Sequence, residues 1–170
     1  MVLNFKHKLQ EALNQIDHQE TKEFIIHPHQ AERTLANTDD ILENYADAKQ
    51  EILNLINHHY KTNFNHDNWL NNKPDEVAHF INEAGSNTLN YSEFKTPHKF
   101  YLYLGNKGFV IAIEQLGQPF NAQHIHANNI KQNEGKAFTF FRNTESTIFF
   151  NDAEETKIAY LLYITSLDPT

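Results

Sequence analysis

The chain of 170 residues contains no cysteine. This absence excludes disulfide scaffolds, thiolate zinc sites, iron–sulfur clusters and cysteine nucleophiles. A chain of this length does not need disulfides, because a domain of this size buries roughly 70% of its unfolded surface. We therefore expect a single domain over 1–170, with a helical half at about 1–90 and a sheet half at about 98–166.

Long apolar runs and basic residues are also scarce. No window approaches the roughly 18 apolar residues of a membrane-spanning helix, so we expect a cytoplasmic protein with no membrane partner. Residues 1–97 contain 8 Lys/Arg against 15 Asp/Glu, and residues 98–170 contain 6 against 7. An acidic chain without a basic stripe lacks the phosphate contacts that dominate nucleic-acid affinity, so we expect no nucleic-acid partner.

Familiar catalytic motifs are missing as well. The sequence contains no glycine-rich phosphate loop, no G-x-S-x-G elbow and no H-E-x-x-H helix. The segment GNKG at 105–108 is too short for a phosphate loop and lacks the terminal Lys-Ser/Thr. We therefore favour a nonenzymatic protein without a cofactor.

Apolar spacing predicts three helices in the first half of the chain. The second covers 37–60 and begins at Asn37, which stands three residues before Asp40 in a capping arrangement. The third follows Pro74 and ends at Gly85. The first, of about 15 residues, has an apolar stripe made of Phe5, Leu9, Ala12, Leu13 and Ile16.

The periodicity changes from residue 99 onward. KFYLYL and FVIAIE, separated by GNKG, predict a hairpin, and GKAFTFF, STIFF and KIAYLLYI predict further strands up to residue 164. The connections are too short for parallel crossovers, so we expect an antiparallel meander. The predicted fold class is α+β, with N-terminal helices packed on one face of a mostly antiparallel sheet of about five strands. Phe80 and Ile81 should pack on sheet residues such as Ile111 or Leu161.

Two histidines lie close together in NAQHIHANN at 121–129. On a strand, His124 and His126 project from the same face and could share a divalent metal. A pair leaves tetrahedral zinc two ligands short, and Glu114 on the preceding strand is our candidate for a further ligand. Because the chain has 11 histidines, a chance His-x-His is expected, so we favour the metal-free interpretation.

Arg142 is a single cation at the end of the apolar segment FTFFR. Beside a polar turn, a guanidinium can hold a carboxylate or phosphate with two hydrogen bonds, which would make the protein a small-ligand binder. The more ordinary alternative is an ion pair with Glu145 or Asp152. We retain Arg142 as a candidate anion site.

Aromatic residues are abundant, with 13 Phe and 7 Tyr, and both faces of FYLYL carry large apolar groups. Either both faces are covered, or one face presents aromatic surface to a partner. We therefore expect an acidic protein that acts through protein–protein contact, as an inhibitor or immunity-like regulator. Its partner would be another protein or a second copy, bound through the aromatic face or an edge strand. The alternatives are a metal-dependent enzyme or metal-binding protein built on His124 and His126, and a small-ligand binder anchored by Arg142.

Overall fold

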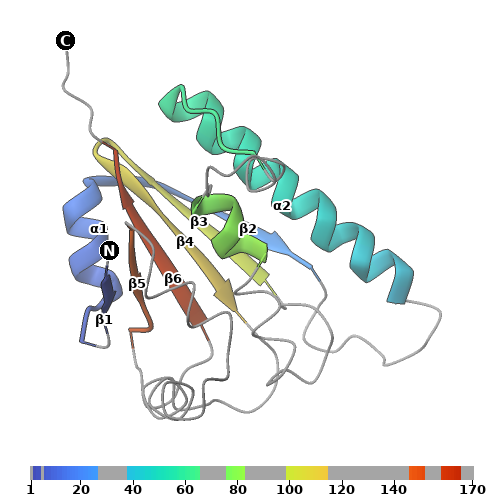
Figure 1. Cartoon of the computed structure of the whole chain (residues 1–170), viewed down its shortest axis with the longest axis horizontal. Helices are drawn as coiled ribbons and strands as arrows, with labels where there is room; N and C mark the ends of the chain where they lie inside the picture. Colours follow the sequence, from blue (N-terminus) through green and yellow to red (C-terminus); the bar gives the residue numbers. More distant parts are fainter. Residues whose placement is uncertain are drawn as a thin grey trace.

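The computed structural model describes residues 2–4, 6–26, 38–65, 76–82, 99–114, 146–151 and 158–165. These residues form an α+β fold in which helices pack on a mostly antiparallel sheet, as the sequence predicts (Figure 1). A short helix at 76–82 accompanies the two longer helices. In chain order, the labelled elements are β1 (Val2–Asn4), α1 (Leu9–Ile16), β2 (His18–Ile25), α2 (Thr38–Tyr60), β3 (Lys99–Gly105), β4 (Gly108–Glu114), β5 (Thr147–Phe149) and β6 (Ile158–Ile164).

The sheet has the strand order β1-β5-β6-β4-β3-β2. The predicted hairpin at GNKG is confirmed as β3 and β4, and STIFF and KIAYLLYI contain β5 and β6. The expected simple meander is wrong, because β4 pairs with β6, the last described strand along the chain, and β1 pairs with β5 in parallel. The predicted strands at FNAQHIH and GKAFTFF lie outside the described residues.

One sheet face is covered by α2 and the helix at 76–82. Alternate residues of the central strands point to this side, where β3 contributes Phe100, Leu102 and Leu104. Phe80 and Ile81 are fully buried in the same core as Ile111 and Leu161, which confirms the predicted packing. Burial of a Phe or Ile side chain stabilises the fold by roughly 1.5–3 kcal/mol.

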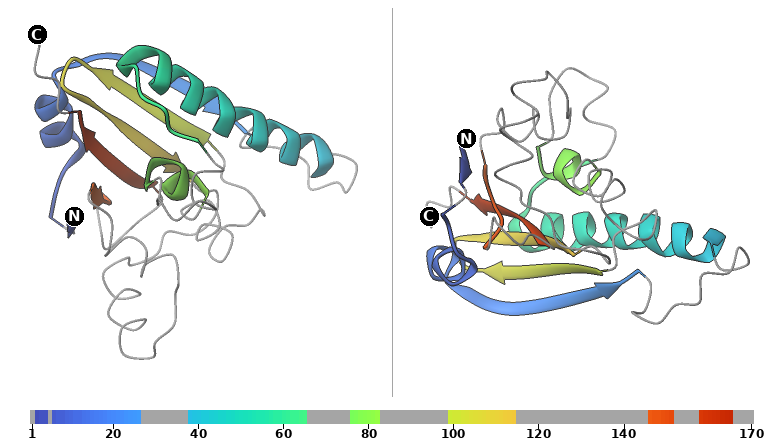
Figure 2. Two further views of the ribbon diagram at one scale, coloured as in Figure 1. Left: turned by 45° about the horizontal axis from the view of Figure 1, so that its top comes forward. Right: turned by 90° about the horizontal axis from the view of Figure 1, so that it is seen from below.

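The opposite face is covered in part by α1. Ala12 and Ile16 are fully buried there, against a row of sheet residues that includes Val110, Ala112 and Leu162. The expectation that all N-terminal helices cover one face is therefore wrong. The cause lies in the central strands, because FVIAIE is apolar at successive positions and both of its faces must be removed from water. Figure 2 shows α1 at one end of the sheet, away from α2.

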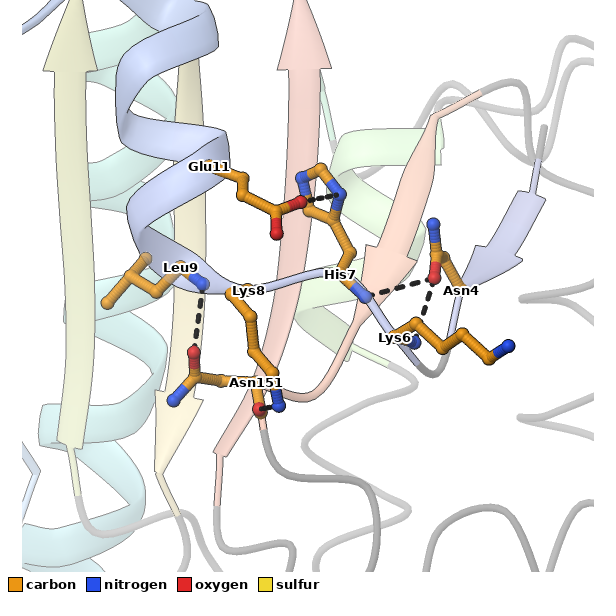
Figure 3. Close-up of polar contacts among 7 residues, drawn as sticks. All are labelled: Asn4, Lys6, His7, Lys8, Leu9, Glu11 and Asn151. Carbon is orange, nitrogen blue, oxygen red and sulfur yellow. Dashed lines mark hydrogen bonds and ion pairs between the residues drawn. The ribbon is translucent and has the colours of Figure 1, made fainter.

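The N-terminal helix is shorter than the predicted 15 residues, because the chain begins with strand β1 and α1 begins only at Leu9. The side-chain Oδ1 of Asn4 accepts hydrogen bonds from the backbone N–H groups of Lys6 at 2.9 Å and His7 at 3.0 Å (Figure 3). Such an Asn-centred turn competes with helix formation at these residues. Phe5, the first residue of the predicted apolar stripe, lies outside the described residues.

The start of α1 is capped by a residue far away in the sequence. Lys8 occupies the N-cap position without a capping side-chain bond of its own. Instead, Oδ1 of Asn151 accepts a hydrogen bond from the backbone N–H of Leu9 at 2.9 Å, and Nζ of Lys8 donates to the Asn151 carbonyl (Figure 3). Asn151 has φ 61°, a left-handed conformation that Asn tolerates better than most residues. The position where α1 begins therefore depends on the chain segment that follows β5.

The other end of α1 holds the β3–β4 turn. Asp17 adopts the left-handed conformation with φ 54° and ends the helix. The backbone N–H of Lys107 donates to the Ile16 carbonyl at 2.9 Å, and that of Asn106 donates to the Asp17 carbonyl at 3.2 Å. This approach requires glycine at position 105, since a Cβ there would lie 2.1 Å from the Ile16 oxygen.

Strand β2 lies in the part of the chain that we expected to be helical. It pairs antiparallel with β3 and forms one edge of the sheet. Its sequence HQETKEFI has mostly exposed residues, so little of its stability comes from burial. In the described ranges, no helix is both long and apolar enough to cross a membrane.

Candidate functional site

Of the residues that the sequence analysis singled out for a site, the structure describes Glu114. It is the last residue of β4 and is half-buried, and its Oε2 accepts a hydrogen bond from the Tyr101 hydroxyl at 3.2 Å. His124, His126 and Arg142 lie outside the described residues, so their roles remain predictions.

The strand register places Glu114 in an ordered array on the α1 side of the sheet. In one row across the strands, Ile25 lies opposite Lys99, and Lys99 lies opposite Glu114. In the next row, Tyr101 lies beside Ala112 of β4, and the row after that contains Tyr103. Directly opposed residues in antiparallel strands point to the same face. We define the tyrosine surface as Ile25, Lys99, Tyr101, Tyr103 and Glu114.

The two tyrosines of this surface stack on each other. The ring centroids of Tyr101 and Tyr103 are 6.2 Å apart, with an interplanar angle of 16°. Both tyrosine side chains are half-buried. Ile25 lies beside them and is 61% exposed, which makes it the more exposed of the two large apolar residues that face solvent in the described ranges. Helix α1 therefore covers Val110 and Ala112 and packs against part of the tyrosine rings, whereas Ile25 stays exposed.

Charged groups lie around the tyrosine rings. Lys99 Nζ is 2.9 Å from Glu23 Oε2 and 4.9 Å from the centroid of the Tyr101 ring. The hydrogen bond with Glu23 raises the pKa of Lys99, so this ammonium stays charged at neutral pH. Lys99 and Glu23 therefore form an ion pair at the edge of the tyrosine surface, while the Glu114 carboxylate accepts a hydrogen bond from Tyr101.

The tyrosine hydroxyls are neutral near pH 7. Burial raises the pKa of Tyr101, and it raises the pKa of Tyr103 to about 12. Tyr160, two strands from Tyr101 in the same row, also has a pKa raised by burial. Such groups cannot act as bases or nucleophiles at neutral pH, but they donate and accept hydrogen bonds. Among the described residues, the hydroxyl of Tyr103 has no hydrogen-bond partner and is available to a bound molecule.

A second feature is a shallow depression, open to solvent, where α1 meets β2. Asp17 lies in this depression, and its Oδ2 accepts a hydrogen bond from Asn106 Nδ2 at 2.6 Å, which helps to hold the β3–β4 turn. We assign this depression a structural role. It is lined by Gln10, Leu13, Asn14, Asp17 and His18.

A metal centre finds no support within the parts of the chain that the structure describes. No group of three or more His, Asp or Glu side chains converges there. Glu114, the one described member of the predicted metal site, lies against Tyr101. The site with His124 and His126 therefore remains a prediction.

Comparison with known proteins identifies no relative. No protein family matches the chain, and no curated protein and no solved structure is significantly similar to it. Functional inference therefore depends on the geometry of the chain itself.

Sequence reasoning found part of the tyrosine surface. It named Tyr101 and Tyr103 among the aromatic residues of FYLYL and Glu114 as a candidate metal ligand, whereas their common face follows from the strand register. The contribution of Ile25 was missed, because HQETKEFI has few residues that favour strands. Its alternation of exposed and half-buried positions becomes clear only when β2 is paired with β3.

Proposed function

We propose that this protein acts by contact with a partner protein through the tyrosine surface, as an inhibitor or immunity-like regulator of that partner. The observation that carries the proposal is the stacked, half-buried pair of Tyr101 and Tyr103 beside Ile25, which is 61% exposed. Tyrosine contributes large contact area with few rotatable bonds and is enriched at interface hot spots.

The charge of the chain supports the same proposal. A net charge of −8 favours rapid association with a positively charged partner, because opposite charges steer the encounter of two proteins. The neutral hydroxyls of the tyrosine surface can donate and accept hydrogen bonds across such a contact. Both the charge of the chain and these hydroxyls therefore suit a contact with a protein partner.

Affinity capture with matched variants tests the proposal. The wild-type protein, the double variant Tyr101→Ser/Tyr103→Ser and the control variant Gln50→Ser/Asn54→Ser are immobilised and exposed to extract of the native cells. The control positions lie on the exposed side of α2. We expect a discrete protein on the wild type and the control, and at least about tenfold less on the tyrosine variant, which corresponds to about 1.4 kcal/mol.

Two outcomes would contradict the proposal. One is equal recovery of the same proteins on all three baits, and the other is recovery of nothing on any of them. Circular dichroism of the double variant must show that its fold is retained, since both rings also contribute to packing on α1.

A further inference from the structure

Within the described part of the chain, no strand pairs with the outer edge of β2. This strand is the last in the sheet order, and its described partner is β3 on the inner side. Figure 2 shows β2, in blue, along the margin of the sheet. An edge strand presents unpaired N–H and C=O groups that can pair with another strand. With eight residues, β2 is longer than any other strand of the sheet.

Symmetry restricts how two copies can pair through this edge. An antiparallel pair of identical strands is related by a two-fold axis perpendicular to the sheet, and each contact occurs twice. Directly opposed residues then point to the same face, so one residue of β2 lies opposite its own copy on the axis. The identity of that residue defines the register.

The charged residues of β2 make some of these registers less stable than others. An axis at Glu20, Lys22 or Glu23 places two like charges directly opposite each other, which is destabilising. An axis at Thr21 places two neutral side chains opposite each other. In that register, Glu20 of each copy lies opposite Lys22 of the other, so two pairs of opposite charge form.

We propose that two copies of this chain associate through antiparallel pairing of their β2 strands, with the two-fold axis at Thr21. Within one copy, Lys22 Nζ already lies 3.1 Å from Glu20 Oε1, so the two copies together form an alternating network of four charges. The irregular pairing with β3 between His18 and Glu20 confines the regular contact to the residues around Thr21. This inference does not depend on the proposed function.

The association has a consequence for the arrangement of the tyrosine surface. Since the axis is perpendicular to the sheet, the two copies form one continuous sheet with the α1 sides facing the same way. Thr21 lies on that side, opposite Tyr103 of the neighbouring strand. The pair of molecules would therefore present two tyrosine surfaces next to each other.

Cysteine crosslinking provides the first test, because the natural chain has no cysteine. In Thr21→Cys, the two thiols lie opposite each other at the spacing of a direct cross-strand pair, which a disulfide can bridge. The matched control is Ile25→Cys on the same face, where the two Cα atoms would be about 26 Å apart along the strands. We expect oxidation to convert Thr21→Cys to a covalent dimer at least about tenfold faster than Ile25→Cys, whereas equal rates would overturn the proposal.

Charge reversal provides the second test and reports on the register. Sedimentation equilibrium of the wild type should show a reversible dimer. Lys22→Glu and Glu20→Lys each place like charges opposite each other, so each should raise the dissociation constant at least about tenfold. The double variant Glu20→Lys/Lys22→Glu restores both pairs and should restore the dimer. A wild type that stays monomeric at all concentrations, or a double variant that associates no better than the single variants, would overturn the proposal.

Discussion

Removal of the Tyr60 hydroxyl tests how α2 is joined to the sheet. Tyr60 is the last residue of α2, and its side chain is 6% exposed. Its oxygen lies 2.8 Å from the carbonyl of Gly105 and 2.6 Å from that of Gly108, and it accepts the backbone N–H of Gly105 at 3.0 Å. The substitution Tyr60→Phe keeps the ring and leaves these buried backbone groups without the hydroxyl.

The expected loss of stability follows from two simultaneous hydrogen bonds, because the hydroxyl donates one to a carbonyl while it accepts one from the Gly105 N–H. A buried donor or acceptor left unsatisfied costs about 1–3 kcal/mol, so we expect Tyr60→Phe to lower the free energy of unfolding by about 2–3 kcal/mol. Urea unfolding followed by circular dichroism should show a midpoint lower by about 1 M, for a slope near 2 kcal/mol/M.

The control is Tyr103→Phe, whose hydroxyl has no hydrogen-bond partner among the described residues. We expect this change to alter the free energy of unfolding by less than about 0.5 kcal/mol. Equal losses for the Tyr60 and Tyr103 variants would refute the reasoning, because the loss would then come from a general effect of removing a phenol oxygen.

Four further predictions concern other parts of the chain. Gly105→Ala places a Cβ 2.1 Å from the Ile16 carbonyl oxygen, so we expect a loss of about 2 kcal/mol and a melting temperature lower by roughly 4–8 °C in calorimetry. Asn151→Ala removes the cap of α1, and hydrogen exchange of the first turn of α1 should become faster, with a loss of about 1 kcal/mol; unchanged exchange would contradict the capping role. Burial raises the pKa of Tyr103 to about 12, so the unfolded chain loses this proton first, near pH 10. The free energy of unfolding should therefore decrease between about pH 10 and 12 in urea titrations. A free energy of unfolding that is independent of pH over this range would exclude the shift. Elemental analysis of protein purified without a histidine tag should find no stoichiometric metal, and a metal that is lost in His124→Ala would show the opposite.

The sequence predicts well those elements whose pattern is decided by burial. In β3, β4 and β6, runs of apolar and aromatic residues indicate strands, because these strands lie in the middle of the sheet. The apolar side of α2 follows from helical spacing, and Ala48, Ile52 and Ile56 are all buried. The hairpin at GNKG is recognisable from its glycines.

The missed elements depend on contacts between residues distant in the sequence. Strand β1 has three residues and forms through parallel pairing with β5, more than 140 positions away. The beginning of α1 depends on Asn4 and Asn151, of which the second follows β5. Strand β2 is an edge strand with polar side chains, so its own propensity indicates little and pairing with β3 decides its conformation.

The candidate site could be predicted in composition but not in position. Alternation in β3 places Tyr101 and Tyr103 on one face, and the aromatic excess indicates that this face has a use. Local patterns do not indicate which face of the sheet α1 covers or how far it extends over that face. The apolar side of an amphipathic helix can pack on either face of an apolar sheet. The exposure of Ile25 depends on this placement.

Site-specific photocrosslinking tests most directly the claim that the tyrosine surface contacts a partner protein. A benzophenone amino acid is introduced in native cells in place of Tyr103, or in place of Gln50 on the exposed side of α2 as the control. A contact at the tyrosine surface predicts a discrete adduct with a second protein from position 103 that is absent from position 50. Adducts of equal yield from both positions, or no adduct with another protein from position 103, would contradict the claim.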